Sequence, residues 1–500
     1  MSLSSALNII NSSFASTAAQ SAVIARNISN ANTPGYSREI ANQATNAYGG
    51  SDVISITRQA NSALLDQLNA STSESASQSA ISAGLSSLAQ TVDDSASASS
   101  ASGAAQNGVS PSAMLANLQS ALATYAASPS DSSLAQAAVT AAGNLAASLN
   151  SGSAAVEQVR SQADANIASS VATINSLLNQ FTSVNATIVN GLASGADVSS
   201  AEDSRDSILT QLSQQIGIST TTNASGSTSI YTDSGATLFQ DVPQTLSFAP
   251  TPTLTAGANG NPVTVNGVPI TGSSAPMAVQ SGALAGYAQL RDVIAPEYQS
   301  QLDQVAGGLI DAFAETDQSP TPTLPPLPGL FTYPGATGLP STTDMTGLAS
   351  QIEVNPSVDP SQGGNVNLLR DGGIADPGGA TYRYNSTGAA SYSGRIQQLM
   401  NAVDTPQAFD ASAGLDASNS LSGYANASVS WLQAQNQQAS DAASYQSSVA
   451  SQASSALSNA TGVDLDTEMT NMLNIENSYT TSAKLLTTVN DMYSALIAAA

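Results

Sequence analysis

The chain has 500 residues and is strongly acidic, with 35 aspartate and glutamate residues against 10 lysine and arginine residues and a formal net charge of −25. Phosphate backbones and anionic membrane surfaces attract clustered Lys and Arg, so this charge argues against binding to nucleic acid or to such a membrane. Cysteine and histidine are absent, which excludes disulfides, thiolate metal sites, and catalytic or zinc sites that depend on histidine.

Composition also limits the form of the core. Aromatic residues make up 4% of the chain, and alanine and serine dominate. Small side chains let helices approach closely but bury little area each, so we expect long, thin helical packing in two to four domains. No run of 18 apolar residues is present, which argues against a membrane-spanning helix. We expect neither a cofactor nor a metal ion.

The first predicted element is an amphipathic helix that ends at a turn. Its apolar residues step by three and four, as in a coiled-coil seam: Leu3, Leu7, Ile10, Phe14, Ile24 and Ile28. The stripe stops at the segment Asn30, Ala31, Asn32, Thr33, Pro34, Gly35 and Tyr36. Pro34 disfavours helical geometry at Thr33, and Gly35 permits a positive φ, so the helix ends and the chain turns.

The segment after the turn predicts a short strand and then a series of helices. Residues 39–51 are polar with two adjacent glycines, so we expect an extended connector, and the alternation at 52–58 predicts a strand. Helical spacing predicts four helices: 61–92, 114–125, 134–149 and 156–188. Ser130 or Asp131 is expected to cap the third helix. The Ser/Ala/Gly-rich residues 93–111 predict a loop.

Two inserts interrupt the helical pattern. After residue 216 the hydrophobic period changes, which predicts a β-rich insert over 217–281, with hairpin-turn signals at Asn259-Gly260 and Asn266-Gly267. A second insert, 317–390, is predicted to be irregular. Its proline-rich start at 319–340 cannot be a helix or a central strand, so we expect a stiff extended loop.

The C-terminal part returns to helix and ends in a second amphipathic stripe. Helical patterns are predicted at 282–316 and 391–461. The final stripe again steps by three and four: Met472, Ile475, Tyr479, Leu486, Val489, Tyr493 and Leu496. We expect the two terminal helices to cover each other's apolar faces. Because two paired helices are marginally stable in water, neighbouring copies are expected to supply the missing burial.

Short motifs at both ends resemble the flagellar axial proteins of bacteria, the family of rod, hook and hook-associated proteins. Residues 30–36, Asn-Ala-Asn-Thr-Pro-Gly-Tyr, with the following Ser37-Arg38, are similar to the N-terminal motif of this family. The segment 462–469, Gly-Val-Asp-Leu-Asp-Thr-Glu-Met, resembles the hook-associated proteins of the hook–filament junction. So does the Arg-Asp segment 203–209, which is expected to open a helix ending at Ile216.

The resemblance implies a nested fold, mainly α with β-rich inserts. The paired terminal helices, 1–40 and 462–500, would form a coiled-coil-like inner tube domain with those of neighbouring copies. The helical-bundle body would comprise 41–216, 282–316 and 391–461. The two inserts, 217–281 and 317–390, would point outward.

The resemblance also implies a structural protein rather than an enzyme. Its expected role is to connect hook to filament as a homo-oligomeric ring, in contact with hook protein and the next hook-associated protein, after delivery by an export chaperone. The N-terminus has no basic leader, since its first positive side chain is Arg26. We therefore expect export to the extracellular flagellum without a cleaved signal peptide.

Two other classes stay open at this point. One is another axial protein, of the rod or hook, although such proteins are usually shorter or richer in β-structure and lack the long helix 156–188. The other is a secreted surface enzyme with a helical stalk, which would need a catalytic site. Asp93-Asp94 and Asp203/Asp206 are the candidate carboxylate pairs, but capping or solvated carboxylates are the commoner interpretation.

A calcium loop is the remaining candidate site. Asp464, Asp466 and Glu468 alternate like the first ligands of such a loop, but Thr470 stands where its glycine is required. We therefore expect Asp464 to cap the last helix, with Asp466 and Glu468 favouring its positive N-terminal dipole.

Overall fold

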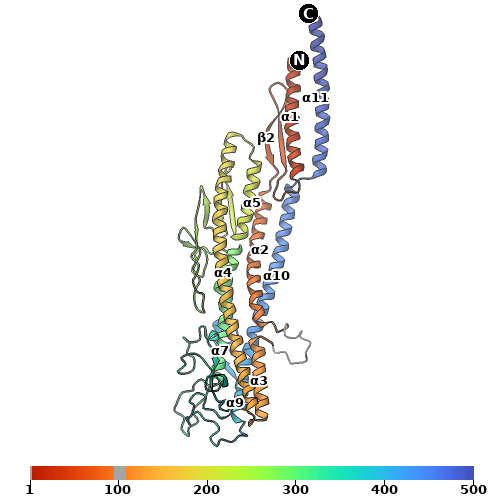
Figure 1. The fold of residues 1–500 in the computed structure, drawn as a ribbon. Coiled ribbons are helices and arrows are strands. Elements are labelled where there is room, and N and C mark those ends of the chain that lie inside the picture. The colour runs from red at the N-terminus through yellow and green to blue at the C-terminus, as the bar shows by residue number, and fades with distance from the viewer. Residues whose placement is uncertain (1–2, 95–107, 500) are drawn as a thin grey trace.

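The computed structural model describes residues 3–94 and 108–499, and it shows long helices aligned along one axis with small sheets beside them (Figure 1). Both chain ends lie at the same end of the molecule. The predicted fold class, mainly α with paired terminal helices and small antiparallel sheets between them, is confirmed. The predicted loop at 93–111 falls largely on residues 95–107, outside the described residues.

The helices carry most of the described chain. In chain order the α-helices are α1 (Leu3–Asn30), α2 (Ser62–Ala89), α3 (Pro111–Ala127), α4 (Ser132–Ser194), α5 (Ser199–Gln215), α6 (Ala283–Gln289), α7 (Ala295–Ala312), α8 (Leu368–Asp371), α9 (Gly394–Asp404), α10 (Leu421–Thr461) and α11 (Leu465–Ala499). Short 3₁₀ turns are η1 (Gln90–Val92), η4 (Leu348–Ser350), η5 (Pro360–Gln362) and η6 (Ala411–Ala413), and the π turn η3 (Leu290–Ile294) joins α6 to α7.

The strands form small antiparallel sheets. They are β1 (Glu39–Thr45), β2 (Ser51–Arg58), β3 (Ile218–Thr222), β4 (Thr228–Thr232), β5 (Thr237–Gln240), β6 (Val242–Pro243), β7 (Leu246–Ser247), β8 (Thr264–Val265), β9 (Val268–Pro269), β10 (Phe331–Thr332), β11 (Glu353–Val354), β12 (Pro406–Ala408) and β13 (Ser418–Ser420). The sheet orders are β1-β2, β3-β4-β5-β6, β7-β8-β9, β10-β11 and β12-β13. Each sheet is therefore local in sequence, and the helices supply the long-range packing.

One end of the molecule is formed by α1, β1, β2 and α11, which we call the head (residues 3–58 and 465–499) (Figure 1). The remaining described residues, 59–94 and 108–464, are the body. Helices α1 and α11 run antiparallel, and the β1–β2 hairpin lies beside α1. The head is thus a small unit of two helices and one hairpin.

The body holds two clusters of buried apolar residues, and α4 contributes to both. The first cluster joins α2, α3, α7, α9 and α10 to the first half of α4. The second joins α5, α6 and the strands of the first insert to the second half of α4. Of the residues that the structure describes, those in the head contribute to neither cluster. The head and body therefore lack a common apolar core.

Helix α4 is a single helix of 63 residues, where the sequence predicted two. Polar residues between the two predicted segments are satisfied by contacts with other elements. Asn150 Nδ2 donates to Ala349 O at 2.7 Å, and Ser153 Oγ donates to Gln299 Oε1 at 2.9 Å. Gly152 lets Leu302 of α7 approach, since a Cβ there would lie 3.1 Å from that side chain. The expected cap at Asp131 is present, accepting from Ser133 N at 2.8 Å.

The strands β3 to β9 lie between Gly217 and Ser281, where the chain leaves and rejoins the body. Gly217 N donates to Ser281 O at 2.9 Å, which closes this neck. Asn266-Gly267 forms the predicted hairpin turn between β8 and β9, with φ of 50° and 81°. The hairpin predicted at Asn259-Gly260 was wrong. Gly260 instead lies against the Arg291 side chain, where an added Cβ would come 2.2 Å from the guanidinium.

Two further segments differ from expectation. Residues 39–45 form strand β1 rather than a connector, because β2 supplies its backbone partners and this polar strand needs no apolar face. The start of the proline-rich loop is not extended as predicted. It folds around the carboxylate of Asp317, which accepts from Ser319 N, Thr323 N and Leu324 N at 2.8 to 3.1 Å.

Asp303 in α7 makes the stability of the body depend on pH. Its carboxylate is buried and accepts from Gly347 N, Ala349 N and Gln299 Nε2 at 2.8 to 2.9 Å. Burial raises its pKa to about 6, against the effect of these hydrogen bonds. The folded state therefore keeps a proton that the unfolded chain loses near pH 4, so this contribution to stability is present below pH 4 and is lost as the pH rises through 6.

We predict that the free energy of unfolding of the wild type, relative to Asp303→Asn, falls by on the order of 3 kcal/mol between pH 4 and pH 7. Urea unfolding of both chains across this range measures the difference. Asp344→Asn is the control, because hydrogen bonds from Ser341 lower the pKa of Asp344, so both states are ionised across this range and its difference curve should stay nearly flat. A flat difference curve for Asp303→Asn would contradict the assignment.

Candidate assembly interface

The two predicted apolar stripes meet along the seam between α1 and α11. Phe14 and Tyr479 pack edge to face with ring centroids 5.0 Å apart. Where the stripes have gaps, small polar side chains make the contact: Ser13 and Ser482 share a hydrogen bond of 2.9 Å, and Ser21 Oγ lies 3.7 Å from Met472 Sδ. Hydroxyls at these positions allow close approach of the helices without leaving buried polar groups unpaired.

Burial of the predicted stripe residues is uneven. Fully buried are Ile10, Ile24 and Val489. Half-buried are Leu3, Leu7, Phe14, Ile28, Met472, Ile475, Leu486 and Tyr493. Tyr479 and Leu496 are 55% and 61% exposed. The single chain therefore buries the seam only in part.

Helix α11 exposes many apolar side chains in addition to the seam. Between 42% and 73% of the surface remains exposed for Leu465, Met469, Leu473, Tyr479, Leu485, Met492, Leu496 and Ile497. Scattered single apolar residues on a surface are ordinary, but a series of large ones along one helix marks an interaction site. The exposed series lies on both sides of the seam with α1.

The turn motif ends α1 and leads the chain into β1. Asn30 Nδ2 donates to the helix carbonyl of Arg26 at 3.0 Å, and Thr33 N donates to Asn30 O at 2.9 Å. Gly35 has a φ of 80°, as the sequence predicted, while Asn32 to Gly35 are exposed. Clefts of about 730 and 1530 Å³ lie along this turn, between head and body.

The last residue of the motif is tied back to α1 through Asn27, which is almost fully buried. Tyr36 OH donates to Asn27 Oδ1 at 2.9 Å, and the Asn27 amide bonds both the N–H and the C=O of Glu39 at 2.9 Å. Burial, and then the charge of Glu39, raise the pKa of Tyr36 to about 12, so its hydroxyl keeps the donated proton. Asn27 thus fixes where the strand leaves the helix.

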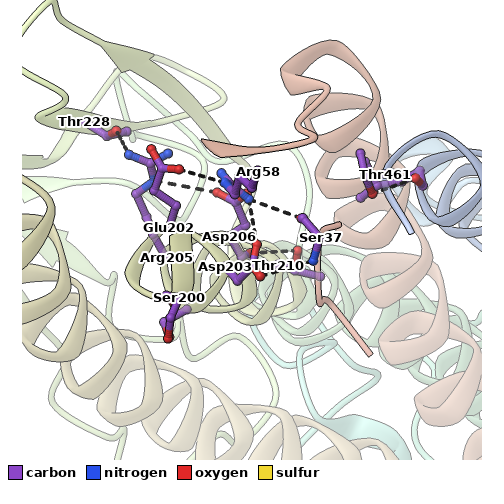
Figure 2. A network of polar contacts seen from close by, with 12 residues as sticks. Ser37, Arg58, Ser200, Glu202, Asp203, Arg205, Asp206, Thr210, Thr228 and Thr461 are labelled. Atoms are coloured by element: carbon purple, nitrogen blue, oxygen red, sulfur yellow. Dashed lines mark hydrogen bonds and ion pairs between the residues drawn. The ribbon is translucent and has the colours of Figure 1, made fainter. Parts of the chain in front are cut away.

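Arg58, at the end of β2, joins the head to α5 of the body (Figure 2). Its side chain is 7% exposed and forms ion pairs with Glu202 at 2.9 Å, Asp203 at 3.0 Å and Asp206 at 2.6 Å. Burial opposes its charge, but these carboxylates outweigh it and raise the pKa of Arg58. Asp203 Oδ2 also accepts from Ser37 N at 3.1 Å. We call Arg58 and the three carboxylates the Arg58 cluster.

A second set of polar contacts links the two segments in which the chain passes between head and body, near residues 58 and 462. Arg38 Nε donates to the buried Glu468 of α11 at 2.6 Å, and Arg38 N donates to Thr461 O at 2.8 Å. Gln59 adds a contact with α10, because its Nε2 donates to Ala460 O at 2.6 Å. Polar and ionic contacts therefore hold the orientation of head on body.

The candidate carboxylate sites have structural partners in this fold. Asp94 accepts from Ser110 N and Oγ at 2.9 and 2.7 Å. Asp203 and Asp206 lie inside α5 rather than at its start, because the helix begins at Ser199, and they pair with Arg58. Asp464 caps α11 as predicted, accepting from Thr467 N at 2.9 Å, whereas Glu468 pairs with Arg38.

The sequence did not reveal the Arg58 cluster, Asn27 or the Arg38–Glu468 pair. One signal was available for the cluster. Glu202, Asp203 and Asp206 fall within one helical turn and a half, and three carboxylates so close together favour a cation between them. The cation is Arg58, which is 144 residues away from Glu202 in the chain. The spacing of the carboxylates could not identify so distant a partner. In the described residues, no helix is both long and apolar enough to cross a membrane.

We predict that Arg58→Ala lowers the free energy of unfolding by about 3 kcal/mol, because three partly buried carboxylates lose their cation. Hydrogen exchange at the Ser37 amide should rise as well, since its acceptor Asp203 is released. Arg383→Ala removes an exposed arginine of the body and should stay within about 0.5 kcal/mol of the wild type. Equal effects from the two variants would mean that Arg58 does not hold the junction.

Comparison with known proteins gives matches at both the body and the C-terminus. Residues 102–320 match the family model of the flagellar hook-associated protein FlgK helical domain. Residues 454–499 match that of the flagellar basal body rod FlgEFG protein C-terminal. These two segments make up just over half of the chain. Among curated proteins, no relative matches it.

A solved structure similar to this chain is that of the flagellar hook junction protein FlgK from Burkholderia pseudomallei. The two are 21% identical with a TM-score of 0.41, over 54% of this chain and 46% of that chain. The alignment thus spans less than half of the solved protein. The two sequence models confirm the family that the short motifs predicted: the chain belongs to the FlgK-like hook-associated proteins of the bacterial flagellum.

Proposed function

We propose that this chain is a structural protein that connects the flagellar hook to the filament by assembling through its head. The observation that carries the proposal is the exposed apolar series on α11, beside a seam that a single chain only half buries. Large apolar side chains along a helix cost free energy in water, at roughly 25 cal/mol per Å² of exposed area. Association of heads would bury them.

The geometry of the junction supports this role. An assembling head needs a defined orientation on the body, and the Arg58 cluster and the hydrogen bond from Arg38 N to Thr461 O provide one. The exposed turn Asn32 to Gly35 lies beside clefts, so it can change shape without disrupting a core. The head would thereby adapt to its neighbours while the body keeps its fold.

The domain division follows the same logic. We propose that residues 1–40 and 462–500 form the inner tube, that the helical body forms the next shell, and that the inserts 217–281 and 317–390 lie outermost. The apolar series on α11 favours the innermost place for the terminal helices, because it needs covering on more than one side. The polar, irregular loops of the inserts suit contact with water.

Partners and location are part of the proposal. The expected neighbours are further copies of the chain in a ring, hook protein on one side and the next hook-associated protein on the other. An export chaperone would keep the exposed face of α11 covered before assembly. The chain would act outside the cell, mechanically and without catalysis. The alternative of a rod or hook protein was expected to lack a long helix over 156–188. In this structure these residues lie within the long helix α4.

We predict that Leu7→Asp or Ile24→Asp leaves the body folded but blocks incorporation into the flagellum, because a carboxylate in the seam separates α1 from α11. Circular dichroism of the purified chain and the amount of chain in isolated hook–filament structures give the two readouts. Leu324→Asp, at an exposed leucine of the second insert, is the matched control. Normal incorporation of both seam variants would count against assembly through the head.

A further inference from the structure

The first insert contains a loop without helix or strand, residues 249–261 between β7 and β8, which we call the strap. Arg160 of α4 is 2% exposed and contacts it. The guanidinium donates to three backbone carbonyls of the strap: Leu254 O at 3.1 Å, Thr255 O at 2.9 Å and Ala258 O. Burial lowers the pKa of Arg160, and a buried cation is costly unless it is hydrogen-bonded. The strap therefore supplies acceptors that Arg160 needs.

Asp164 of α4 and Arg291 of the π turn η3 hold the two ends of the strap. Asp164 accepts from Thr251 N at 2.8 Å and from Thr251 Oγ1 at 3.2 Å. The fully buried Arg291 pairs with Asp164 at 2.5 Å and donates through Nη2 to Asn261 O at 2.9 Å. Asn261 N donates in turn to Thr251 Oγ1 at 3.0 Å, which joins the two ends. Buried charged side chains thus fix both ends of the strap, as Arg160 fixes its middle.

The middle of the strap meets the second insert at Thr346 and Gly347. A Cβ added at Gly257 would lie 2.8 Å from Thr346 Cγ2, and one added at Gly347 would lie 3.3 Å from Ala256 Cβ. Both glycines have a positive φ, 76° and 81°, and neither position leaves room for a side chain without displacing its neighbour. The backbones of the two inserts are therefore in direct contact here.

The turn of the second insert at this contact, residues 345–349, is also held by α7 and α4. Asp303 of α7 accepts from Gly347 N at 2.8 Å and from Ala349 N at 2.9 Å. Asn150 of α4 donates to Ala349 O at 2.7 Å. The turn is thus bound to the helices through its backbone and contacts the strap through the same residues. One continuous series of contacts runs from α4 through the strap to this turn.

We propose that the strap is a coupling element, which sets the position of the turn 345–349 and thereby fixes the two inserts relative to each other. Of the strap residues, all of which the structure describes, Leu254 alone is buried. A loop with so few apolar contacts opens locally unless other interactions hold it closed. The buried charges of α4 and η3 supply those interactions. The inference goes beyond the proposed function, because it concerns the single chain before any assembly.

The coupling has a consequence that a purely local role would not have. Coupling between two segments is carried by contiguous packed contacts, and it acts equally in both directions. Loosening the strap should therefore loosen the turn 345–349, although no atom of the turn is changed. Loosening the turn should in the same way loosen the strap.

Hydrogen exchange of the purified chain, measured by mass spectrometry, tests both directions. Thr251→Val removes the hydroxyl between Asp164 and Asn261 with little change in shape, so exchange should rise in the strap. Exchange should also rise by about fivefold in the peptide 345–352, across the contact. Asp303→Asn, which replaces one acceptor oxygen that holds the turn, should raise exchange of the strap by a similar factor.

Thr253→Val is the matched control, because it makes the same change at an exposed threonine of the strap. It should leave exchange of the peptide 345–352 as in the wild type. Arg160→Met is the stronger variant and should loosen both segments further. Since removal of a buried cation can also prevent folding, Thr251→Val and Asp303→Asn decide the test.

Cross-linking tests the contact itself, because the wild type has no cysteine. In the double variant Ala256→Cys with Thr346→Cys, a short bis-maleimide should link the two inserts within one chain. Addition of Thr251→Val should slow this link, because the strap then spends less time closed. The two single-cysteine variants identify any links between chains.

The outcomes are distinct. A rise in exchange that stays within the strap for Thr251→Val, and within the turn for Asp303→Asn, would overturn the inference, because the two inserts would then be held independently. An equal rise for Thr253→Val, or a cross-link that Thr251→Val does not slow, would also contradict it. None of these results bears on assembly through the head. Reciprocal changes in exchange, together with the slower link, would establish the coupling.

Discussion

The position of the head on the body depends on an ionic contact rather than on a shared apolar core. Arg58 reaches from the end of β2 into three carboxylates of α5, and neither apolar cluster of the body extends into the head. An apolar core tolerates little change of shape, since it is packed to crystal-like density. Ion pairs of a largely buried arginine also need a defined geometry. The orientation of the head on the body therefore depends on this cluster.

The same constraint explains the composition of the seam. Ser21 and Ser482 occupy positions where a coiled coil would have large apolar residues, and Ser13 contacts Ser482. Their small side chains bring α1 and α11 close together, but they bury little area, so the pair gains only modest stability from its own contact. The apolar residues that would have made the pair self-sufficient lie on the outside of α11. In the proposed assembly, contacts with neighbouring copies would supply the stability that the single pair of helices lacks.

Much of this could be predicted from the sequence. Steps of three and four identified α1, α2, α3, α10 and α11, and Pro34-Gly35 marked the end of the first helix. The errors came where tertiary contacts overrode a local signal. The segments predicted separately at 134–149 and 156–188 are one helix, and Asn150 and Ser153 between them have partners in the second insert and α7, about 150 to 200 residues away. Strand β1 was missed because its mostly polar side chains give no apolar alternation, and its pairing with β2 is made by backbone and polar side-chain hydrogen bonds.

The candidate site divides in the same way. The seam residues followed from periodicity, which is a local property of each helix. The Arg58 cluster could not be predicted in this way, because ion pairs between residues distant in the chain produce no periodic pattern in the sequence. Asp203 and Asp206 were weighed as caps or catalytic carboxylates, and their partner could be named only once β2 and α5 were seen side by side (Figure 2).

Helix α4 has a mechanical consequence. Its 63 residues give it a length of about 95 Å at 1.5 Å per residue, and both apolar clusters grip it along that length. A pull or twist applied at one cluster therefore reaches the other through an unbroken ladder of backbone hydrogen bonds rather than through a flexible linker. The body would therefore transmit load along its length to the ionic contacts of the Arg58 cluster at the head.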